Sequence, residues 1–138
     1  MNKEITLFII LIMTLIFSNA VNSCSAVKEP AMIWVYIHPV KCLDNAWEQD
    51  WVNKSGLTGE ESFRGYKEYL DKTGERQIII NYYAKSGITV YNYTSEKVSD
   101  VVCEACECQR GDIISLLIPY GNLSKMRQLG YNTTKIQN

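Results

Sequence analysis

The stretch that organises the chain is Cys103-Glu104-Ala105-Cys106-Glu107-Cys108-Gln109-Arg110-Gly111-Asp112, which leads into the apolar run Ile113 to Ile118. It holds three cysteines in six residues and then a polar turn, in which Gly111 supplies conformational freedom. The run that follows is continuous over the length of a strand and ends at Pro119, so it predicts a buried strand. We therefore expect the cysteines to lie at the end of a hairpin that leads into this strand.

A second strand is predicted at Met32 to Ile37, where aliphatic residues alternate with Trp34 and Tyr36. Downstream, Trp47 and Trp51 are four residues apart, which is the spacing of one helical face. We expect these two indoles to cover the edge of the core, and stacking on a ligand is the alternative.

Two helices are predicted from apolar stripes and end signals. The segment Glu60 to Lys72 carries such a stripe, and Thr58 and Glu61 at its start have the spacing of a capping box. The segment Ser124 to Leu129 ends before Gly130, a residue common just beyond helix ends.

The segment between these helices is ambiguous. Its apolar residues favour a helix over Gln77 to Tyr83 and then a strand from Ile88 to Tyr93, while a hairpin that turns at Ala84 to Gly87 is the rival. With the helix, the order β-α-α-β-β-α predicts one α+β domain over residues 32–138. We expect helices on one face of an antiparallel sheet, with a truncated ferredoxin-like arrangement as the best guess.

The amino terminus predicts export. A short polar start precedes the apolar run Ile5 to Phe17, and small residues follow, which is typical of a secretory signal over residues 1–23. A membrane span needs roughly 20 apolar residues, so an uncleaved anchor is the weaker alternative. Cleavage after Ala20 is one possibility. In the other, Val21-Asn22-Ser23-Cys24 resembles a lipobox, which would lipidate Cys24 and make residues 24–31 a tether.

The cysteine count fits the second possibility. Five cysteines in an exported chain leave one without a partner, and acylation of Cys24 would leave four. We expect these four to form disulfides, since export places them in an oxidising compartment. A bond between Cys106 and Cys108 would be strained. Two patterns stay open: Cys42 with Cys106 and Cys103 with Cys108, or Cys42 with Cys108 and Cys103 with Cys106.

Metal binding is the alternative use of the same residues. Cys103, Cys106 and Cys108 could supply three thiolates, with Cys42 or His38 as the fourth ligand of a tetrahedral Zn site, and Cu is a further candidate. Because the chain has no second paired cysteine knuckle, we expect no cofactor.

Catalysis finds little support in the sequence. A thiol-redox enzyme needs an electropositive setting for its thiolate, whereas Glu104 and Glu107 flank these cysteines. No serine-histidine-aspartate set, phosphate loop or pair of catalytic carboxylates stands out. The tripeptide Arg110-Gly111-Asp112 matches that of integrin ligands, but we expect an ordinary tight turn because an apolar strand starts directly after it.

Charge and composition narrow the partners. The chain has 14 basic and 15 acidic residues without a basic block, so nucleic acid and anionic membrane surfaces are poor candidates. A membrane contact is expected only through the lipid anchor or an uncleaved signal. Possible glycosylation sites are the four Asn-x-Ser/Thr sequons at Asn53, Asn92, Asn122 and Asn132.

The run Val101-Val102-Cys103 through Asp112, the strand after it and the segment Leu123 to Tyr131 resemble the carboxyl-terminal third of small exported lipoprotein-like proteins of prokaryotes. Those proteins often have Pro at the position of Gln109. The resemblance implies export and a structural role for the cysteines, but no substrate. We therefore expect a non-enzymatic, cell-surface or secreted binding module, with a metal-binding or thiol-redox protein as the alternative.

Overall fold

The apolar run after the cysteine cluster forms β3 (Asp112–Pro119), the central strand of a three-stranded antiparallel sheet. The computed structural model describes residues 29–100 and 103–134. β1 (Met32–Ile37) and β2 (Asn92–Lys97) pair with β3 on either side, so that Val35 and Tyr93 both lie opposite Leu116. Since both outer strands are antiparallel to β3, they run parallel to each other.

One face of the sheet forms the core. Alternate side chains of a strand point to opposite faces, and Ile114, Leu116 and Ile118 of β3 are fully buried on the same face as Val35 of β1. They pack with side chains from the helices in one apolar cluster. The aliphatic residues that alternate along β1 therefore lie on the face of the sheet that the helices cover.

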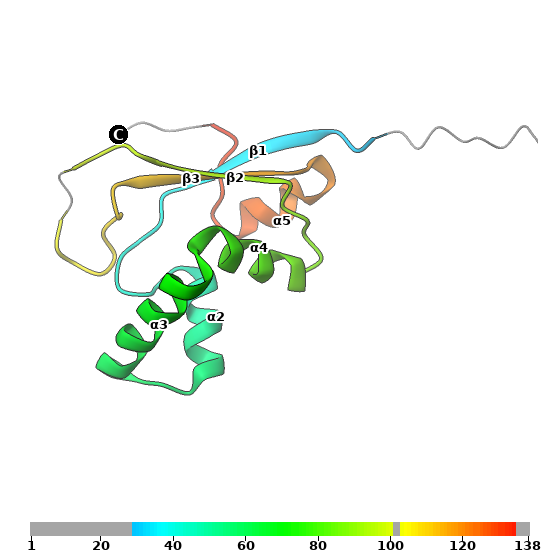
Figure 1. Cartoon of the computed structure of the whole chain (residues 1–138). Coiled ribbons are helices and arrows are strands. Elements are labelled where there is room, and N and C mark those ends of the chain that lie inside the picture. The colour runs from blue at the N-terminus through cyan, green and yellow to red at the C-terminus, as the bar shows by residue number, and fades with distance from the viewer. Residues whose placement is uncertain (1–28, 101–102, 135–138) are drawn as a thin grey trace, which may run out of the picture.

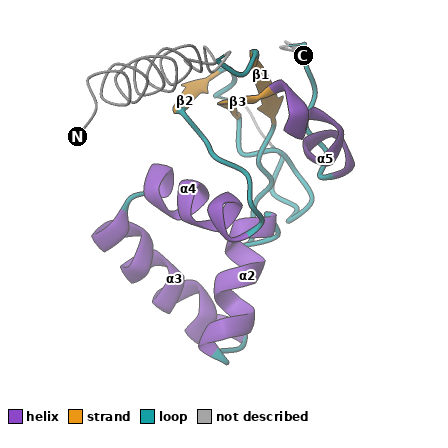
Figure 2. Cartoon of the chain, turned by 90° about the vertical axis from the view of Figure 1, so that its right-hand side faces the viewer, coloured by secondary structure: helices purple, strands orange, loops and turns teal. Residues whose placement is uncertain are grey.

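Three helices connect β1 to β2, namely α2 (Ala46–Ser55), α3 (Gly59–Thr73) and α4 (Glu75–Lys85). After β3 come a short 3-10 turn, η1 (Tyr120–Asn122), and α5 (Leu123–Gln128). Helices α2, α3, α4 and α5 of the described chain lie on the same side of the sheet, and α2 and α3 lie farthest from it (Figures 1 and 2). α4 supplies Ile78, Ile79 and Tyr83 to the core and α5 supplies Leu123 and Met126, so both helices cover the sheet.

The α+β class and the helical cover on one face are confirmed. So are both strands expected from apolar runs and the helices expected around Glu60 to Lys72, Gln77 to Tyr83 and Ser124 to Leu129. The parallel outer strands, joined through helices and separated by β3, make a split β-α-β unit. Any closer likeness to a ferredoxin-like fold stays a prediction.

Two local expectations are wrong. The strand predicted at Ile88 to Tyr93 starts only at Asn92, because Ile88 and Val90 fill the core on the approach to β2. The capping box predicted at the start of α3 does not form, since Thr58 makes no side-chain hydrogen bond to that helix end. The helix that contains both indoles, α2, also adds an element to the expected order.

The predicted signal, residues 1–23, and the first part of the predicted tether, residues 24–28 with Cys24, lie outside the described residues. Residues 29–31 of the tether are described, and the Ala31 carbonyl accepts a hydrogen bond from the Tyr120 N–H at 2.7 Å. Within the described ranges, every helix is too short or too polar to cross a bilayer.

Candidate functional site

The four cysteines of the described chain come together in two disulfides. Cys42 bonds Cys106 and Cys103 bonds Cys108, with Cα separations of 5.0 and 5.8 Å. This is one of the two patterns that the sequence left open. The first bond joins residues 64 apart and so ties the loop after β1 to the loop between β2 and β3.

Backbone hydrogen bonds hold these two loops side by side. The Lys41 N–H donates to the carbonyl of Cys108 at 3.0 Å, and the Arg110 N–H donates to the carbonyl of Pro39 at 2.8 Å. Between these bonds, Val40 forms an antiparallel bridge with Gln109. The Cys42–Cys106 bond therefore reinforces a contact that the backbone already makes.

Asn45 fixes the loop from its other side. Its side-chain oxygen accepts from the Val40 N–H at 2.9 Å and its amide donates to the Val40 carbonyl at 2.8 Å, as a neighbouring strand would. The same amide donates to Glu48 at 2.7 Å, and Glu48 also accepts from the Asn45 N–H at the start of α2. Asn45 and Glu48 are both buried, so these bonds satisfy polar groups that water cannot reach.

The cysteine cluster itself lies at the surface. Cys103 and Cys106 are exposed, as are the acidic residues Glu104 and Glu107, whereas Cys108 is 9% exposed. In this bonded state the four sulfurs are not thiolates. Elsewhere in residues 29–100 and 103–134, His38 included, no three histidine, cysteine or acidic side chains gather in an arrangement that could hold a metal ion.

A charged network lies beside the cluster. Arg110 donates two hydrogen bonds to Glu75, the first residue of α4, and two to Asp112, and its guanidinium lies 3.9 Å from Glu48. Burial raises the pKa of Glu48, although the bonds from Asn45 and the charge of Arg110 lower it. Burial alone would lower the pKa of Arg110, but its bonds to Glu75 and Asp112 raise it, so the guanidinium stays charged.

The Arg-Gly-Asp tripeptide is part of this network. Gly111 has φ near 90°, the left-handed region that favours glycine, and it accepts backbone bonds from Val98 and Ser99. Arg110 and Asp112 bind each other at 2.8 and 3.1 Å. The backbone bends at Gly111 and enters β3 at Asp112, and the two charged side chains of the tripeptide are used within the fold.

A cavity of about 160 Å³ lies in the helical layer formed by α2, α3 and α4. Its lining includes four aromatic side chains, namely Trp47, Trp51, Tyr69 and Tyr82. Trp47 belongs to the core, while Trp51 is half-buried and stacks on Tyr69 with ring centroids 5.8 Å apart. Trp47 therefore lies within the core and not only at its edge, and both indoles line a cavity.

The polar side chains of the cavity come from two helices. α2 supplies Asp50 and Lys54, and α4 supplies Asn81 and Lys85. Both lysines bind the one carboxylate, at 2.5 Å for Lys54 and 3.2 Å for Lys85. The hydrogen bond from Lys54 is the main cause that lowers the pKa of Asp50, so this carboxylate is ionised at neutral pH.

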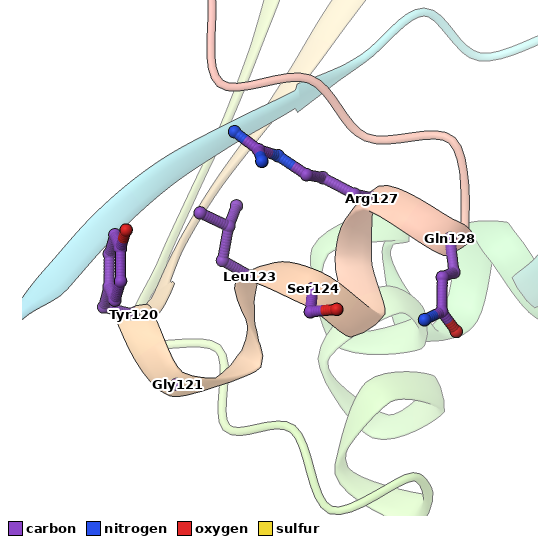
Figure 3. Close-up of a pocket in the computed structure, with 6 residues that line it drawn as sticks. All are labelled: Tyr120, Gly121, Leu123, Ser124, Arg127 and Gln128. Carbon is purple, nitrogen blue, oxygen red and sulfur yellow. The ribbon is translucent and has the colours of Figure 1, made fainter.

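Two other hollows are more open. Figure 3 shows a groove of about 650 Å³ at η1 and α5, where the side chains of Tyr120, Leu123 and Arg127 point to one side and Gln128 points away. Tyr120 is 58% exposed, so this groove is a surface feature. The outer face of the sheet has a hollow of about 220 Å³, lined by Trp34, Tyr36, Thr94, Glu96 and Ser115.

The sequons are spread over the surface. Asn53, Asn92 and Asn132 are exposed and Asn122 is half-buried. Asn53 lies in α2, Asn92 at the start of β2, Asn132 beside β1 and Asn122 in η1. Their glycosylation stays a prediction.

No family model, curated protein or solved structure matches the chain. Sequence patterns singled out Trp47 and Trp51 but missed the residues that complete the cavity. Tyr82 and Lys85 were not expected beside Asp50 because Lys85 and Asp50 are 35 residues apart. The four-residue spacing of Trp47 and Trp51 was the signal that could have pointed to this cavity, because it predicts a helix, now seen as Ala46–Ser55, with both indoles on one face.

Proposed function

We propose that the chain is an exported, extracytoplasmic module that binds a partner and catalyses no reaction, with its cysteines as a structural framework. The observation that carries this proposal is the pair of disulfides, which use every cysteine of the described chain. Disulfides form and persist in oxidising compartments and are rare in the cytosol. The signal-like start of the sequence supports the same compartment.

The proposal includes a lipid anchor at Cys24, with secretion as its alternative. With four of the five cysteines bonded to each other, Cys24 is the odd one, and a lipobox-like run precedes it. The described chain starts beside β1, whereas α2 and α3 lie on the far side of the molecule (Figure 1). A tether over residues 24–31, which leads into β1, would therefore leave the helical layer open to a partner.

The partner is a protein or a small molecule, and nucleic acid is excluded from the proposal because the chain carries no basic block. Use of the four sequons would add sugar to several surfaces and is compatible with export. The other candidate function is a metal-binding (Zn or Cu) or thiol-redox protein that uses Cys42, Cys103, Cys106 and Cys108 in their reduced form.

Two measurements test the proposal on protein purified from its native membrane or medium. Thiol titration without reductant should find no free thiol, and intact-mass analysis should find an acylated start at Cys24. An unmodified start at Val21 would refute the anchor and leave secretion. Four free thiols with one bound zinc or copper per chain would refute the framework and favour the metal-binding alternative.

A further inference from the structure

The cavity in the helical layer has the size of a small-molecule site. Its volume is about 160 Å³, and one water molecule occupies about 30 Å³ of liquid, so it has room for roughly five waters. Pockets for drug-sized ligands are larger, at ~300 Å³ or more. The cavity therefore suits a compact molecule with a single ring.

Aromatic side chains set the shape of this molecule. Trp51 and Tyr69 stack nearly in parallel, with an interplanar angle of 17°, and Trp47 and Tyr82 complete the aromatic part of the lining. Aromatic rings favour offset-stacked or edge-to-face contact with other rings. A flat, apolar ring would fit this lining best.

The charged side chains set the sign of the ligand. Lys54 and Lys85 share the single carboxylate of Asp50, so the lining carries one excess positive charge. Aromatic rings alone would attract a cation, but two ammonium groups at the same cavity repel one. The balance favours an anion.

The hydrogen-bonding groups point the same way, because the lining has more donors than acceptors. Asn81 uses its side-chain oxygen to accept from Gln77 at 2.8 Å, which leaves its amide hydrogens available. Each lysine ammonium has three donors and Asp50 cannot use them all. A ligand rich in acceptors would satisfy these groups.

We propose that this cavity binds a small aromatic carboxylate, with the carboxylate at Lys54 and Lys85 and the ring against the aromatic lining. This proposal names a class of ligand for the binding function proposed above, and it rests on that function. The open groove at η1 and the hollow on the outer sheet face lack this combination of enclosure, aromatic lining and excess donors.

Benzoate is the probe, and benzamide is its neutral control of the same shape. The chain has three tryptophans, so a ¹H–¹⁵N correlation spectrum contains three indole N–H signals, assigned with single Trp→Phe variants. Benzoate should shift the signals of Trp47 and Trp51 in a saturable way and leave that of Trp34, which lies on the sheet, unchanged. Benzamide should bind at least ~fivefold more weakly, since it lacks the charge.

Lys85→Met removes one ammonium group and keeps the length of the side chain. It should weaken benzoate binding about fivefold and leave benzamide binding unchanged. Lys72→Met is the matched control, because Lys72 is an exposed helix residue that pairs with Glu68 outside the cavity. It should bind benzoate as the wild type does.

The proposal is overturned if benzamide binds as well as benzoate, if only Trp34 responds, or if the two lysine variants behave alike. These failures would not touch the proposed export, because thiol titration and the mass of the mature chain do not depend on benzoate. Conversely, four free thiols in the native protein would refute the framework while benzoate binding still reported on the cavity.

Discussion

Arg110 and Glu75 are joined by two hydrogen bonds, from Nη1 to Oε1 at 2.7 Å and from Nη2 to Oε2 at 3.2 Å. Glu75 opens α4 and Arg110 lies just before β3, so this pair connects the helical layer to the central strand. Glu75 also accepts a bond from the Tyr93 hydroxyl of β2 at 3.1 Å. A carboxylate is favourable at a helix N-terminus, which adds to the stability of the pair.

Arg110→Met should lower the free energy of unfolding by about 3 kcal/mol, because it leaves the carboxylates of Glu75, Asp112 and Glu48 without their shared cation. Urea unfolding followed by circular dichroism measures the change. Arg127→Met is the control, since Arg127 is exposed on α5, and it should cost less than ~0.5 kcal/mol. Equal urea midpoints for the two variants would show that the network adds nothing to stability.

Glu48→Gln should become more stable relative to the wild type as the pH rises. Burial raises the folded-state pKa of Glu48 above its value in the unfolded chain, near ~4.3, so folding favours the protonated form. That contribution is present below the unfolded pKa and is lost as the pH rises through the folded pKa. Gln cannot ionise, yet it can still accept the bonds from Asn45.

The measurement is the difference in unfolding free energy between wild type and Glu48→Gln at pH 4 and pH 7. We expect the unfolding free energy of Glu48→Gln, relative to that of the wild type, to be higher at pH 7 than at pH 4. If the relative stability of Glu48→Gln stays constant or falls between pH 4 and pH 7, the ionised form of Glu48 does not destabilise the folded protein.

Strong apolar patterns made much of this fold predictable from the sequence. The run Ile113 to Ile118 identifies β3 because most side chains of this central strand are buried. β1 and α3 also follow their patterns closely. In β1 the aliphatic residues Ile33, Val35 and Ile37 pack in or against the core, whereas Trp34 and Tyr36 lie on the outer face.

The bounds of β2 could not be predicted from apolar patterns. It is an edge strand whose residues are mostly exposed, and its position is set by backbone pairing with β3, as in the pair Ser95 and Ile114. The apolar residues Ile88 and Val90 fill the core just before it. An apolar pattern reports burial and not strand pairing, and the predicted strand was therefore placed too early.

Gly65 gives a similar lesson within α3. From the sequence it is a weak point, because glycine disfavours a helix by about 1 kcal/mol relative to alanine. In the structure a Cβ at this position would lie 2.8 Å from Leu57 and 3.0 Å from Trp51. The glycine therefore permits the close contact between α2 and α3, a constraint that exists only once both helices are placed.

The buried hydroxyls of Tyr83 and Tyr131 are 2.8 Å apart and bond each other across 48 residues of sequence. Burial raises the pKa of both hydroxyls, so both stay protonated in the folded chain at neutral pH. Tyr83→Phe or Tyr131→Phe should each cost about 1–2 kcal/mol, because each leaves the other hydroxyl buried without a partner. The double variant should cost less than the sum of the two.

A double-mutant cycle, measured by thermal and urea unfolding, gives the coupling between the two hydroxyls. Additive losses would contradict the bond. Tyr36→Phe is a suitable control, because Tyr36 is half-buried on the outer face of the sheet, and it should have little effect.

The two disulfides should differ in their contributions to stability. The Cys42–Cys106 bond closes a loop across 64 residues, for which the chain-entropy model gives about 4 kcal/mol, whereas Cys103–Cys108 closes one across 5 residues and gives about 2 kcal/mol. Cys42→Ser with Cys106→Ser should therefore lower the melting temperature more than Cys103→Ser with Cys108→Ser. Paired serine substitutions avoid leaving a free thiol that could exchange with the remaining bond.

Peptide mapping without reduction checks the pairing on which this comparison depends, since the sequence also allowed Cys42 with Cys108. If the bonds are a framework, reductant should destabilise the wild type to the level of the Cys42 and Cys106 double variant, and a chelator should have no effect. If the cysteines hold zinc or copper instead, the chelator should destabilise the protein and the reductant should not. A free Cys42 thiol without metal would contradict both accounts, because the loop after β1 would then be held to the cluster by hydrogen bonds, such as those of Lys41 and Arg110, and not by a disulfide or a metal.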